Sequence, residues 1–442
     1  MPSYACDARA IFLASAASAL AGLAIQACLA WFLLPAGRGE YAVCILFASL
    51  LTLTCTIGQE VANVYSLASK RLDVSHALSQ SLLVGLATSV VACGIGYSLT
   101  HTSLPFLDKA PIRLFRLSLL CIPATAFHMY LTRIFLGMRT IRTFTLLMAA
   151  PRFVAFAGLL TASVVGLSVG TAIMIHAASQ GSVVIIALSL LVIRHAARLV
   201  RVEWAKLRES LSYGLRFYVG KLASMTNVQI GTIILAVSSV DPASLGMFAA
   251  VSALASRLWL VAESLQTAIL PRACADPDGQ REAIAQCVRL CLVCSAVVAL
   301  VVGLLARPII GLVLSPRFLP VLIPFQLLLP GVVVRAIPKI LTAYFNGIGR
   351  PGVTSAAIGL AVAANIGLMY VLLPRWGLSG VAAAMTSAYT FEALIMLLAF
   401  CRLSGTPLRR ALLLRAADLG AITEVISRRL TRASRTPRSA GR

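Results

Sequence analysis

The chain has 442 residues, of which 59% are hydrophobic and only 12% charged, and its formal net charge is +23. A soluble domain carries about 25% charged residues, so this composition excludes an ordinary soluble fold and indicates a membrane protein. The positive charge does not predict nucleic-acid binding, because no polar stretch is long enough for a soluble domain and basic loops of membrane proteins meet anionic lipid heads.

Long apolar runs predict an all-α, polytopic membrane protein with about twelve transmembrane helices. A helix needs about 20 apolar residues to cross the bilayer, and these runs do not alternate with the period of two that a β-barrel requires. The run after Arg9 is too long for a signal-peptide core and is predicted to be the first span. The predicted spans are 10–34, 42–68, 79–99, 114–135, 143–165, 170–193, 212–238, 244–270, 284–306, 318–343, 353–373 and 378–401.

The longest internal connection is basic and separates two blocks of six spans. We therefore expect an N-terminal six-helix lobe at 1–195, a cytoplasmic linker at 196–211, a C-terminal six-helix lobe at 212–402 and a basic cytoplasmic tail at 403–442. Leucines and isoleucines recur at helical spacing among the arginines of the tail. This pattern predicts either an amphipathic helix on the inner leaflet or a solvated segment, followed by disorder.

The distribution of basic residues predicts the orientation, because cytoplasmic loops are enriched in Lys and Arg. With a cytoplasmic N-terminus, the internal cytoplasmic loops hold twelve Lys and Arg residues and the opposite loops hold seven. The tail from Arg402 onward adds ten arginines. Both termini are therefore expected in the cytoplasm.

Three short motifs recur in the two halves at a nearly constant separation and at the same place in the order of the spans. They are PAxxGxYA at 35–42 and PAxxGxFA at 242–249, FxG at 135–137 and 345–347, and GLS at 166–168 and 377–379. One such match would arise by chance, but three together favour a duplication. Two repeats of six spans share one orientation, so a pseudo-two-fold axis along the membrane normal should relate the lobes.

Several basic residues fall inside predicted spans, where a charge costs at least ~2.5–3.5 kcal/mol and usually has a function. Cations there outnumber carboxylates, which predicts a cavity that binds an anion, and guanidinium groups suit phosphate oxygens. Pairing with glutamates is the alternative. The predicted substrate-binding residues are Arg152 and Arg257, both in the middle of a span, followed by Arg335, Arg216 and Lys221. Arg133, Arg289 and Lys339 lie near span ends and are expected to reach the interface.

Carboxylates inside spans are few, and we predict that Glu60 and Glu263 act in ion coupling or as partners of the cations. The tenth span contains four prolines, which predicts either a broken helix beside a cavity or a kinked packing helix. Three cysteines on one helical face, Cys287, Cys291 and Cys294, are expected to pack rather than to bind a metal. The sequence contains no HExxH, P-loop or GxSxG motif, so we predict no cofactor, no catalytic residue and a transporter rather than an enzyme.

Two stretches of the second half carry a family resemblance. The first combines Asn-Gly-x-Gly-Arg with an apolar span holding Asn-Ile, then Leu-Pro and Gly-x-x-Gly; the second is the 29 residues from Leu245 to Ala273. This pattern resembles the polysaccharide transporter (Wzx-like) flippases of the multidrug/oligosaccharidyl-lipid/polysaccharide exporter superfamily. The matching positions are Asn346, Gly347, Gly349, Arg350, Asn365, Ile366, Leu373, Pro374, Gly377, Gly380 and Ala382, with Gly246, Phe248, Ala249, Arg257 and Pro271 in the second stretch.

The resemblance implies a flippase for undecaprenyl-pyrophosphate-linked oligosaccharide in the bacterial inner (cytoplasmic) membrane, working by alternating access. Its expected partners are the lipid-linked oligosaccharide, anionic membrane lipids, and polysaccharide polymerase and chain-length proteins. Multidrug cation antiporters of the same superfamily are the first alternative. They typically use carboxylates in spans 1 and 7, whereas this chain has no acid in span 1 after Asp7 and none in span 7 before Asp241. A membrane assembly protein without transport activity is the second alternative.

Overall fold

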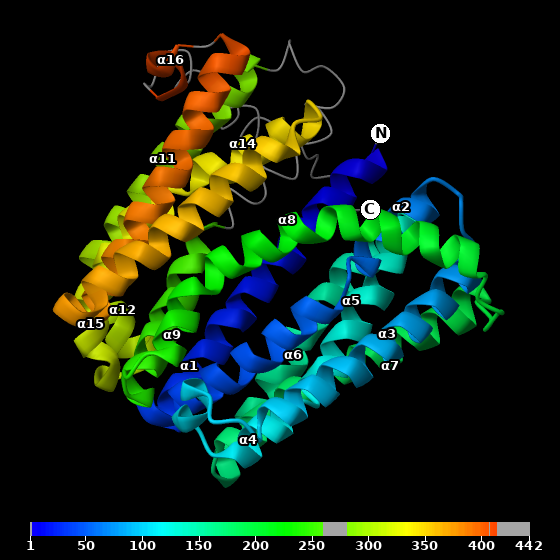
Figure 1. Cartoon of the computed structure of the whole chain (residues 1–442), viewed down its shortest axis with the longest axis horizontal. Coiled ribbons are helices and arrows are strands. Elements are labelled where there is room, and N and C mark those ends of the chain that lie inside the picture. Colours follow the sequence, from blue (N-terminus) through cyan, green and yellow to red (C-terminus); the bar gives the residue numbers. More distant parts are fainter. Residues whose placement is uncertain (1, 260–280, 406, 413–442) are drawn as a thin grey trace, which may run out of the picture. The chain divides into compact units, whose positions relative to one another are not determined.

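The computed structural model describes residues 2–259, 281–405 and 407–412, and all regular secondary structure in these ranges is helical (Figure 1). The all-α prediction is therefore confirmed. The first half of the chain contains α1 (Pro2–Cys55), α2 (Gln59–Ala68), α3 (Val74–Leu99), η1 (Pro105–Lys109), α4 (Ile112–Ser118), α5 (Cys121–Gly137), α6 (Ile141–Val165) and α7 (Val169–His195). The second half contains α8 (Trp204–Val237), α9 (Pro242–Ser256), η2 (Arg257–Trp259), α11 (Arg281–Leu304), α12 (Ala306–Ile309), η3 (Ile310–Leu314), η4 (Pro316–Val321), α13 (Leu322–Val334), α14 (Ala336–Gly347), α15 (Pro351–Ser404) and α16 (Leu408–Leu412).

The two longest helices each contain two spans that meet at one non-helical residue. In α1 this residue is Leu34, with φ 60° and ψ 173°, directly before Pro35, which excludes the helical conformation from the residue that precedes it. In α15 it is Gly377, with φ 55° and ψ −134°, a conformation open almost only to glycine. The sequence places span boundaries at both points.

The number of spans agrees with the predicted twelve. Eight helices in the described ranges are long and apolar enough to cross a membrane, and two of them, Ala17–Leu53 and Gly352–Ser404, are the double helices just described. The apolar segment Leu222–Val237 of α8 supplies a further span. The span predicted at 244–270 begins with α9 and η2, and its remainder lies outside the described residues.

The chain divides into two compact units, and each unit contains several separate segments of the sequence. Unit 1 contains Met1–Arg257, Leu304–Leu328 and Val362–Met385, and unit 2 contains Leu258–Gly303, Leu329–Ala361 and Thr386–Arg442. The lobes expected at 1–195 and 212–402, and the linker between them, remain predictions. Most of the tail expected at 403–442 lies outside the described residues.

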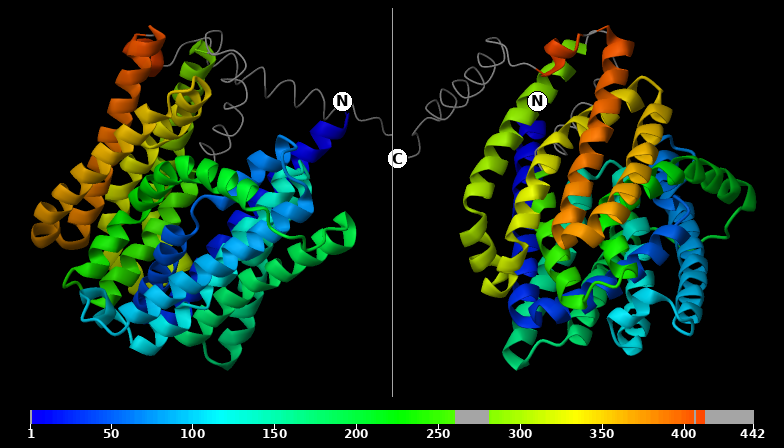
Figure 2. Two further views of the ribbon diagram at one scale, coloured as in Figure 1. Left: turned by 45° about the vertical axis from the view of Figure 1, so that its right-hand side comes forward. Right: turned by 60° about the vertical axis from the view of Figure 1, so that its left-hand side comes forward.

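Unit 1 is organised around α1 and α5. Helix α1 packs against α6 and α9, and α5 packs against α2, α3 and α7 (Figure 2). The core beside α5 contains Leu78, Leu131, Ile134, Phe135 and Val183, all almost fully buried. Large apolar side chains elsewhere on α3, α6 and α7 are exposed, among them Val165 at 90%. A soluble protein does not expose this much apolar surface, whereas a bilayer covers it.

The duplicated PAxxG turns pack directly against each other inside unit 1. A Cβ atom on Gly39 would overlap the carbonyl oxygen of Pro242, and a Cβ atom on Gly246 would overlap the carbonyl oxygen of Pro35. Gly39 and Gly246, like Pro35 and Pro242, are equivalent positions of the repeat. The contact is therefore reciprocal, as it is where two copies of one motif meet across a local two-fold axis.

The FxG motif also has matching backbone geometry in its two copies. After α5, the amide of Thr140 donates to the carbonyl of Phe135 (3.0 Å); after α14, the amide of Arg350 donates to the carbonyl of Phe345 (2.8 Å). In both copies the bond ends the helix in the same way, with one residue of positive φ after the last turn: Arg139 in the first copy and Gly349 in the second. The glycines of the GLS motifs, Gly166 and Gly377, both have positive φ, but their ψ angles are 103° and −134°, so this motif differs in conformation between the copies. The local structure therefore supports the duplication inferred from the sequence.

A second close contact in unit 1 joins α2 and the first part of α8. The backbones of Gly58 and Gly214 approach so closely that a Cβ atom on either glycine would overlap the other residue. The rings of Tyr65 and Tyr213 stack beside them with centroids 4.0 Å apart. Helices α2 and α8 come from the predicted N-terminal and C-terminal lobes. Within unit 1, the two halves of the sequence therefore meet through glycine backbones here as well as at the PAxxG turns.

The core of unit 2 forms where α11, α14 and the last part of α15 pack together (Figure 1). Its largest buried side chains are Tyr344, Phe345 and Phe400, and the ring of Tyr344 meets that of Phe400 edge-on at 5.1 Å. Cys291 lies in this core as a packing residue, with Sγ 3.9 Å from Oγ of Ser295.

Candidate functional site

Arg152, one of the two arginines that lie in the middle of a predicted span, is on α6, and its side chain reaches α1. Its Nη1 donates a hydrogen bond to Oγ of Ser18, which is itself buried. The contact depends on the packing of α6 against α1. Arg152 stays exposed overall and is not sealed in an apolar core.

Arg257, the second of them, is the first residue of η2, directly after α9. Its guanidinium lies against Gly22 of α1: a Cβ atom on Gly22 would be 3.0 Å from Nη2 and 3.2 Å from Cζ of Arg257. The absence of a side chain at position 22 therefore lets the guanidinium lie on the helix backbone. Arg257 is half-buried.

The two arginines approach the same face of α1. Ser18 and Gly22 are four residues apart, so they lie one above the other on the helix surface, about 6 Å apart along its axis. Two helices from different halves of the sequence, α6 and η2, thus each bring one guanidinium to adjacent turns of α1. We call these two arginines with Ser18 and Gly22 the α1 site. Two guanidinium forks that reach adjacent turns of one helix suit an anion with several oxygens, such as a phosphate or diphosphate.

Arg335, the third predicted residue, belongs to a different cluster, in unit 2. Its side chain is only 5% exposed, and its Cζ lies 4.9 Å from the ring centre of Trp259 and 4.3 Å from that of Tyr389. Nζ of Lys339 lies 4.9 Å from the same Trp259 ring. The sequence singled out neither aromatic residue, and it assigned Lys339 to the interface. The signal for Lys339 is its spacing of four from Arg335, which puts both cations on one helix face.

Glu60 is the predicted coupling residue that the structure describes. It is buried in the first turn of α2, where a helix N-terminus favours a carboxylate, and it interacts electrostatically with Arg133 of α5. Buried polar groups surround this helix start: Nε2 of Gln59 donates to Oδ1 of Asn63 (3.0 Å), and Nδ2 of Asn63 donates to Oγ of Ser81 (2.8 Å).

The remaining predicted site residues are Arg216, Lys221 and Glu263. Arg216 and Lys221 belong to α8, but their side chains lie outside the described part of the structure, as does all of Glu263. Their roles remain predictions.

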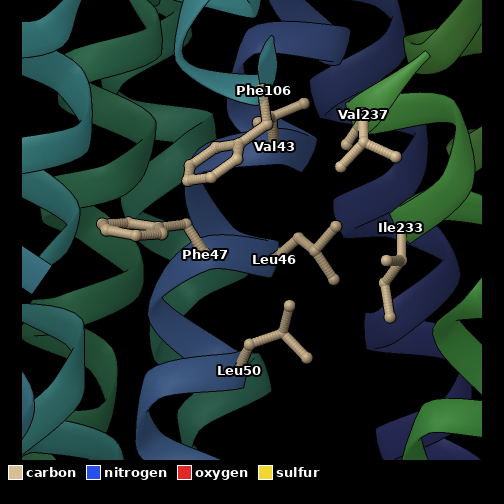
Figure 3. Close-up of a pocket in the computed structure, with 8 residues that line it drawn as sticks. Val43, Leu46, Phe47, Leu50, Phe106, Ile233 and Val237 are labelled. Carbon is tan, nitrogen blue, oxygen red and sulfur yellow. The ribbon is translucent and has the colours of Figure 1, made fainter. Parts of the chain in front are cut away.

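An apolar pocket opens elsewhere in unit 1, between the second half of α1, η1 and the end of α8 (Figure 3). It contains about 320 Å³ of space not occupied by atoms, part of it open to the surroundings. Phe47 and Phe106 line one part and Ile233 and Val237 another, and the other lining residues are Val43, Leu46, Leu50 and Ala236. A pocket with this lining offers no partner for an anionic group.

Comparison with known proteins places the chain in a family. The model of the polysaccharide biosynthesis protein family matches residues 7–274, more than half of the chain. The chain therefore belongs to this family, as its sequence motifs indicate. Among curated proteins, none matches the chain.

Solved structures of membrane transporters share the fold. The lipid II flippase MurJ in an inward closed conformation is 15% identical, with a TM-score of 0.73 and 89% of each chain covered. An inward-facing multidrug resistance MATE family transporter of the MOP superfamily is 14% identical, with a TM-score of 0.66, 89% of this chain and 96% of that chain covered. The Vibrio cholerae MATE transporter VcmN in the bent form is 13% identical, with a TM-score of 0.54, 93% of this chain and 100% of that chain covered.

These findings establish the class of protein. The chain is a multi-pass membrane protein with the two-lobed, all-α fold of flippases and transporters, and its family belongs to polysaccharide biosynthesis. At such low sequence identities the structural likeness concerns the fold and does not identify the substrate.

Proposed function

We propose that the protein flips a polyprenyl-pyrophosphate-linked oligosaccharide across the bacterial cytoplasmic membrane by alternating access, for the biosynthesis of a surface polysaccharide. The observation that carries this proposal is the α1 site, where Arg152 and Arg257 present two guanidinium groups at adjacent turns of one helix. A pyrophosphate has oxygens enough for both forks, and a cationic drug would be repelled. The family and the MurJ-like fold agree with this substrate class.

The other parts of the proposal follow from this role. Glu60, which is buried at the start of α2 and interacts electrostatically with Arg133, is the candidate for coupling to a proton or sodium gradient, together with Glu263. The lobes at 1–195 and 212–402 alternate between closing the inner and the outer side. Polysaccharide polymerase and chain-length proteins are the proposed partners, and anionic lipids contact the basic linker and tail.

Export of a cationic drug is the second candidate function, because MATE transporters also share the fold over about nine-tenths of this chain. The two functions are separated by deleting the gene and measuring lipid-linked glycan and dye efflux in the same cells. We expect the deletion strain to accumulate lipid-linked glycan, to lose surface polysaccharide and to export dyes normally. Reduced dye efflux with normal surface polysaccharide contradicts the proposal and supports the drug exporter.

Membrane topology provides an independent test of the proposed orientation. Reporter domains fused after Ser238 and after Leu373 should lie outside the cytoplasm, and those fused after Ala205 and after Leu403 should lie inside. The reason is the excess of basic residues in the loops placed inside. Activity of a periplasmic alkaline phosphatase reporter and of a cytoplasmic fluorescent reporter measures this. A periplasmic C-terminus is incompatible with the proposal.

A further inference from the structure

Arg38 is a buried cation in the turn between the first two predicted spans. Its side chain is only 5% exposed, although it follows the break of α1 at Leu34 by four residues. Its Nη2 donates a hydrogen bond to Oε1 of Gln26, and its Cζ lies 5.4 Å from the centre of the Tyr41 ring. An amide oxygen and an aromatic ring attract a cation but carry no full negative charge. The charge of the guanidinium is therefore not cancelled by these two partners.

No carboxylate compensates the charge of Arg38 either. In the part of the chain that the structure describes, Arg38 forms no ion pair, and its buried Nε has no acceptor. Glu40, the closest carboxylate in sequence, interacts electrostatically with Arg113. Burial of a charge without a partner is costly, and a buried donor without an acceptor often marks a functional group. These properties indicate a residue that binds a negatively charged ligand at one stage of its work.

The contact with Gln26 places Arg38 in line with the α1 site. Gln26 is four residues beyond Gly22 and eight beyond Ser18, so the three positions follow one another along one face of α1. Eight residues of helix correspond to about 12 Å along the axis. The two arginines of the α1 site contact the first two positions, and Arg38 contacts the third. Three guanidinium groups of unit 1 thus reach successive turns of one helix.

The backbone beside Arg38 is a place where the two halves of the sequence meet. Gly39, the next residue, packs against the carbonyl of Pro242 in the second PAxxG turn. Close to this turn, Nζ of Lys109 donates a hydrogen bond to the carbonyl of Val240. The turns lie on the outer side in the proposed orientation. Opening of the outer side by alternating access separates these contacts and uncovers the guanidinium.

We infer that Arg38 is a third phosphate-binding arginine, which binds the pyrophosphate after the α1 site, at the outer end of the path across the membrane. A pyrophosphate has two phosphate groups, and Arg257 and Arg38 reach adjacent turns of α1. Gln26 and Tyr41 hold the Arg38 guanidinium in place before the ligand arrives. The inference rests on the proposed function for its natural ligand, the lipid-linked pyrophosphate. A soluble pyrophosphate has the same chemistry, and the experiment distinguishes the two sources.

Binding of pyrophosphate compounds tests the role of Arg38 directly. The purified full-length protein in detergent is titrated with inorganic pyrophosphate, undecaprenyl pyrophosphate or undecaprenol, and binding is followed by microscale thermophoresis. The titrations use the variant Arg152→Gln, in which Arg257 and Arg38 remain as a pair. We expect both pyrophosphate compounds to bind and undecaprenol not to bind. Adding Arg38→Gln to this variant should weaken binding at least tenfold, and adding Arg38→Lys should weaken it less, because the charge is kept.

Arg116→Gln in the same background is the matched control. Arg116 also belongs to the predicted outer side and also lies over a tyrosine ring, 5.1 Å from the centre of that of Tyr97, but it is exposed. Its replacement should leave the affinity for both pyrophosphate compounds unchanged. Elution as a single species and an unchanged helical circular dichroism spectrum show that each variant is folded.

A cysteine at position 38 tests whether this place opens to the outer side and needs a positive charge. The eleven natural cysteines are first replaced, and Arg38→Cys is added. A membrane-impermeant methanethiosulfonate reagent applied from outside should label this cysteine. After reconstitution, a positively charged reagent should restore part of the flipping that Arg38→Cys loses, and a negatively charged one should restore none, because the ligand is an anion. A purely structural role of Arg38 gives no such dependence on the sign of the charge.

The inference is overturned if neither pyrophosphate compound binds, if Arg38→Gln binds them as tightly as Arg116→Gln, or if the cysteine is never labelled from outside. Arg38 is then a structural cation held by its two neutral partners. Dependence on Arg38 for inorganic pyrophosphate alone supports the anion site and assigns it a soluble ligand. A protein that binds pyrophosphate through Arg38 but flips no glycan retains the site and loses the proposed function. Flipping that Arg38→Gln leaves unchanged retains the function and loses the site.

Discussion

Replacing Arg152 or Arg257 by alanine should reduce polysaccharide export at least a hundredfold, with the protein still folded in the membrane. Each arginine reaches α1 at an adjacent turn, at Ser18 and Gly22, and removing one leaves a single fork for the proposed pyrophosphate. Loss of one charge-assisted contact of this kind costs on the order of 3 kcal/mol, and each 1.4 kcal/mol corresponds to a factor of ten. Surface polysaccharide is measured in a deletion strain that carries each variant at equal membrane abundance.

Conservative substitutions and a matched control make this prediction specific. Lysine at either position should restore part of the export, because the charge returns but the bidentate fork does not. Arg201→Ala, which removes an equal charge from an exposed loop, should export normally. If Arg152→Ala and Arg257→Ala both export as well as Arg201→Ala, the α1 site does not bind the substrate.

Replacing Gly39 or Gly246 by alanine should destabilise the protein by about 1–3 kcal/mol, the usual cost of overpacking a tight contact. A Cβ atom at either position would overlap a backbone carbonyl of the other turn, and a backbone cannot rotate away as a side chain can. The loss of this contact should also impair export, since the two turns join the proposed lobes. Thermal unfolding of the purified protein in detergent measures the first effect.

Gly94→Ala is the matched control, because Gly94 lies inside α3 and a Cβ atom there meets nothing within 4 Å. In a helix interior, alanine is more favourable than glycine by roughly 0.5–1 kcal/mol. This variant should therefore be as stable as the parent or more stable. Equal melting temperatures for Gly39→Ala, Gly246→Ala and Gly94→Ala would show that the PAxxG turns are not in tight contact.

Span boundaries could be predicted from the sequence where a single proline or glycine interrupts the helix. Pro35 excludes a helical conformation at Leu34, and Gly377 adopts a conformation that other residues avoid, so both breaks can be read from single residues. The break between Cys55 and Gln59 was missed, because the predicted second span ran without interruption from 42 to 68. Ile57 and Gly58 adopt positive φ there, next to the close contact with Gly214, which is far away in sequence.

In the candidate site, the charged residues could likewise be predicted from the sequence, whereas their partners could not. Depth within a span pointed to Arg152, Arg257 and Arg335, because charge in hydrocarbon is costly whatever the neighbours are. Their partners were not predictable, since Ser18 is 134 residues from Arg152 and only packing brings α6 to α1. Trp259 and Tyr389 were missed because an aromatic residue in an apolar span is unremarkable until a cation is found beside it.

Reconstituted flipping tests the central claim most directly. The purified protein is placed in liposomes with a fluorescent undecaprenyl-pyrophosphate-linked oligosaccharide, and a membrane-impermeant quencher reports how much of the lipid changes leaflet. The account predicts flipping that depends on the protein, requires the pyrophosphate and is lost in Arg152→Ala and Arg257→Ala. Flipping at the rate of protein-free liposomes, with transport of a cationic dye by the same preparation, would contradict it.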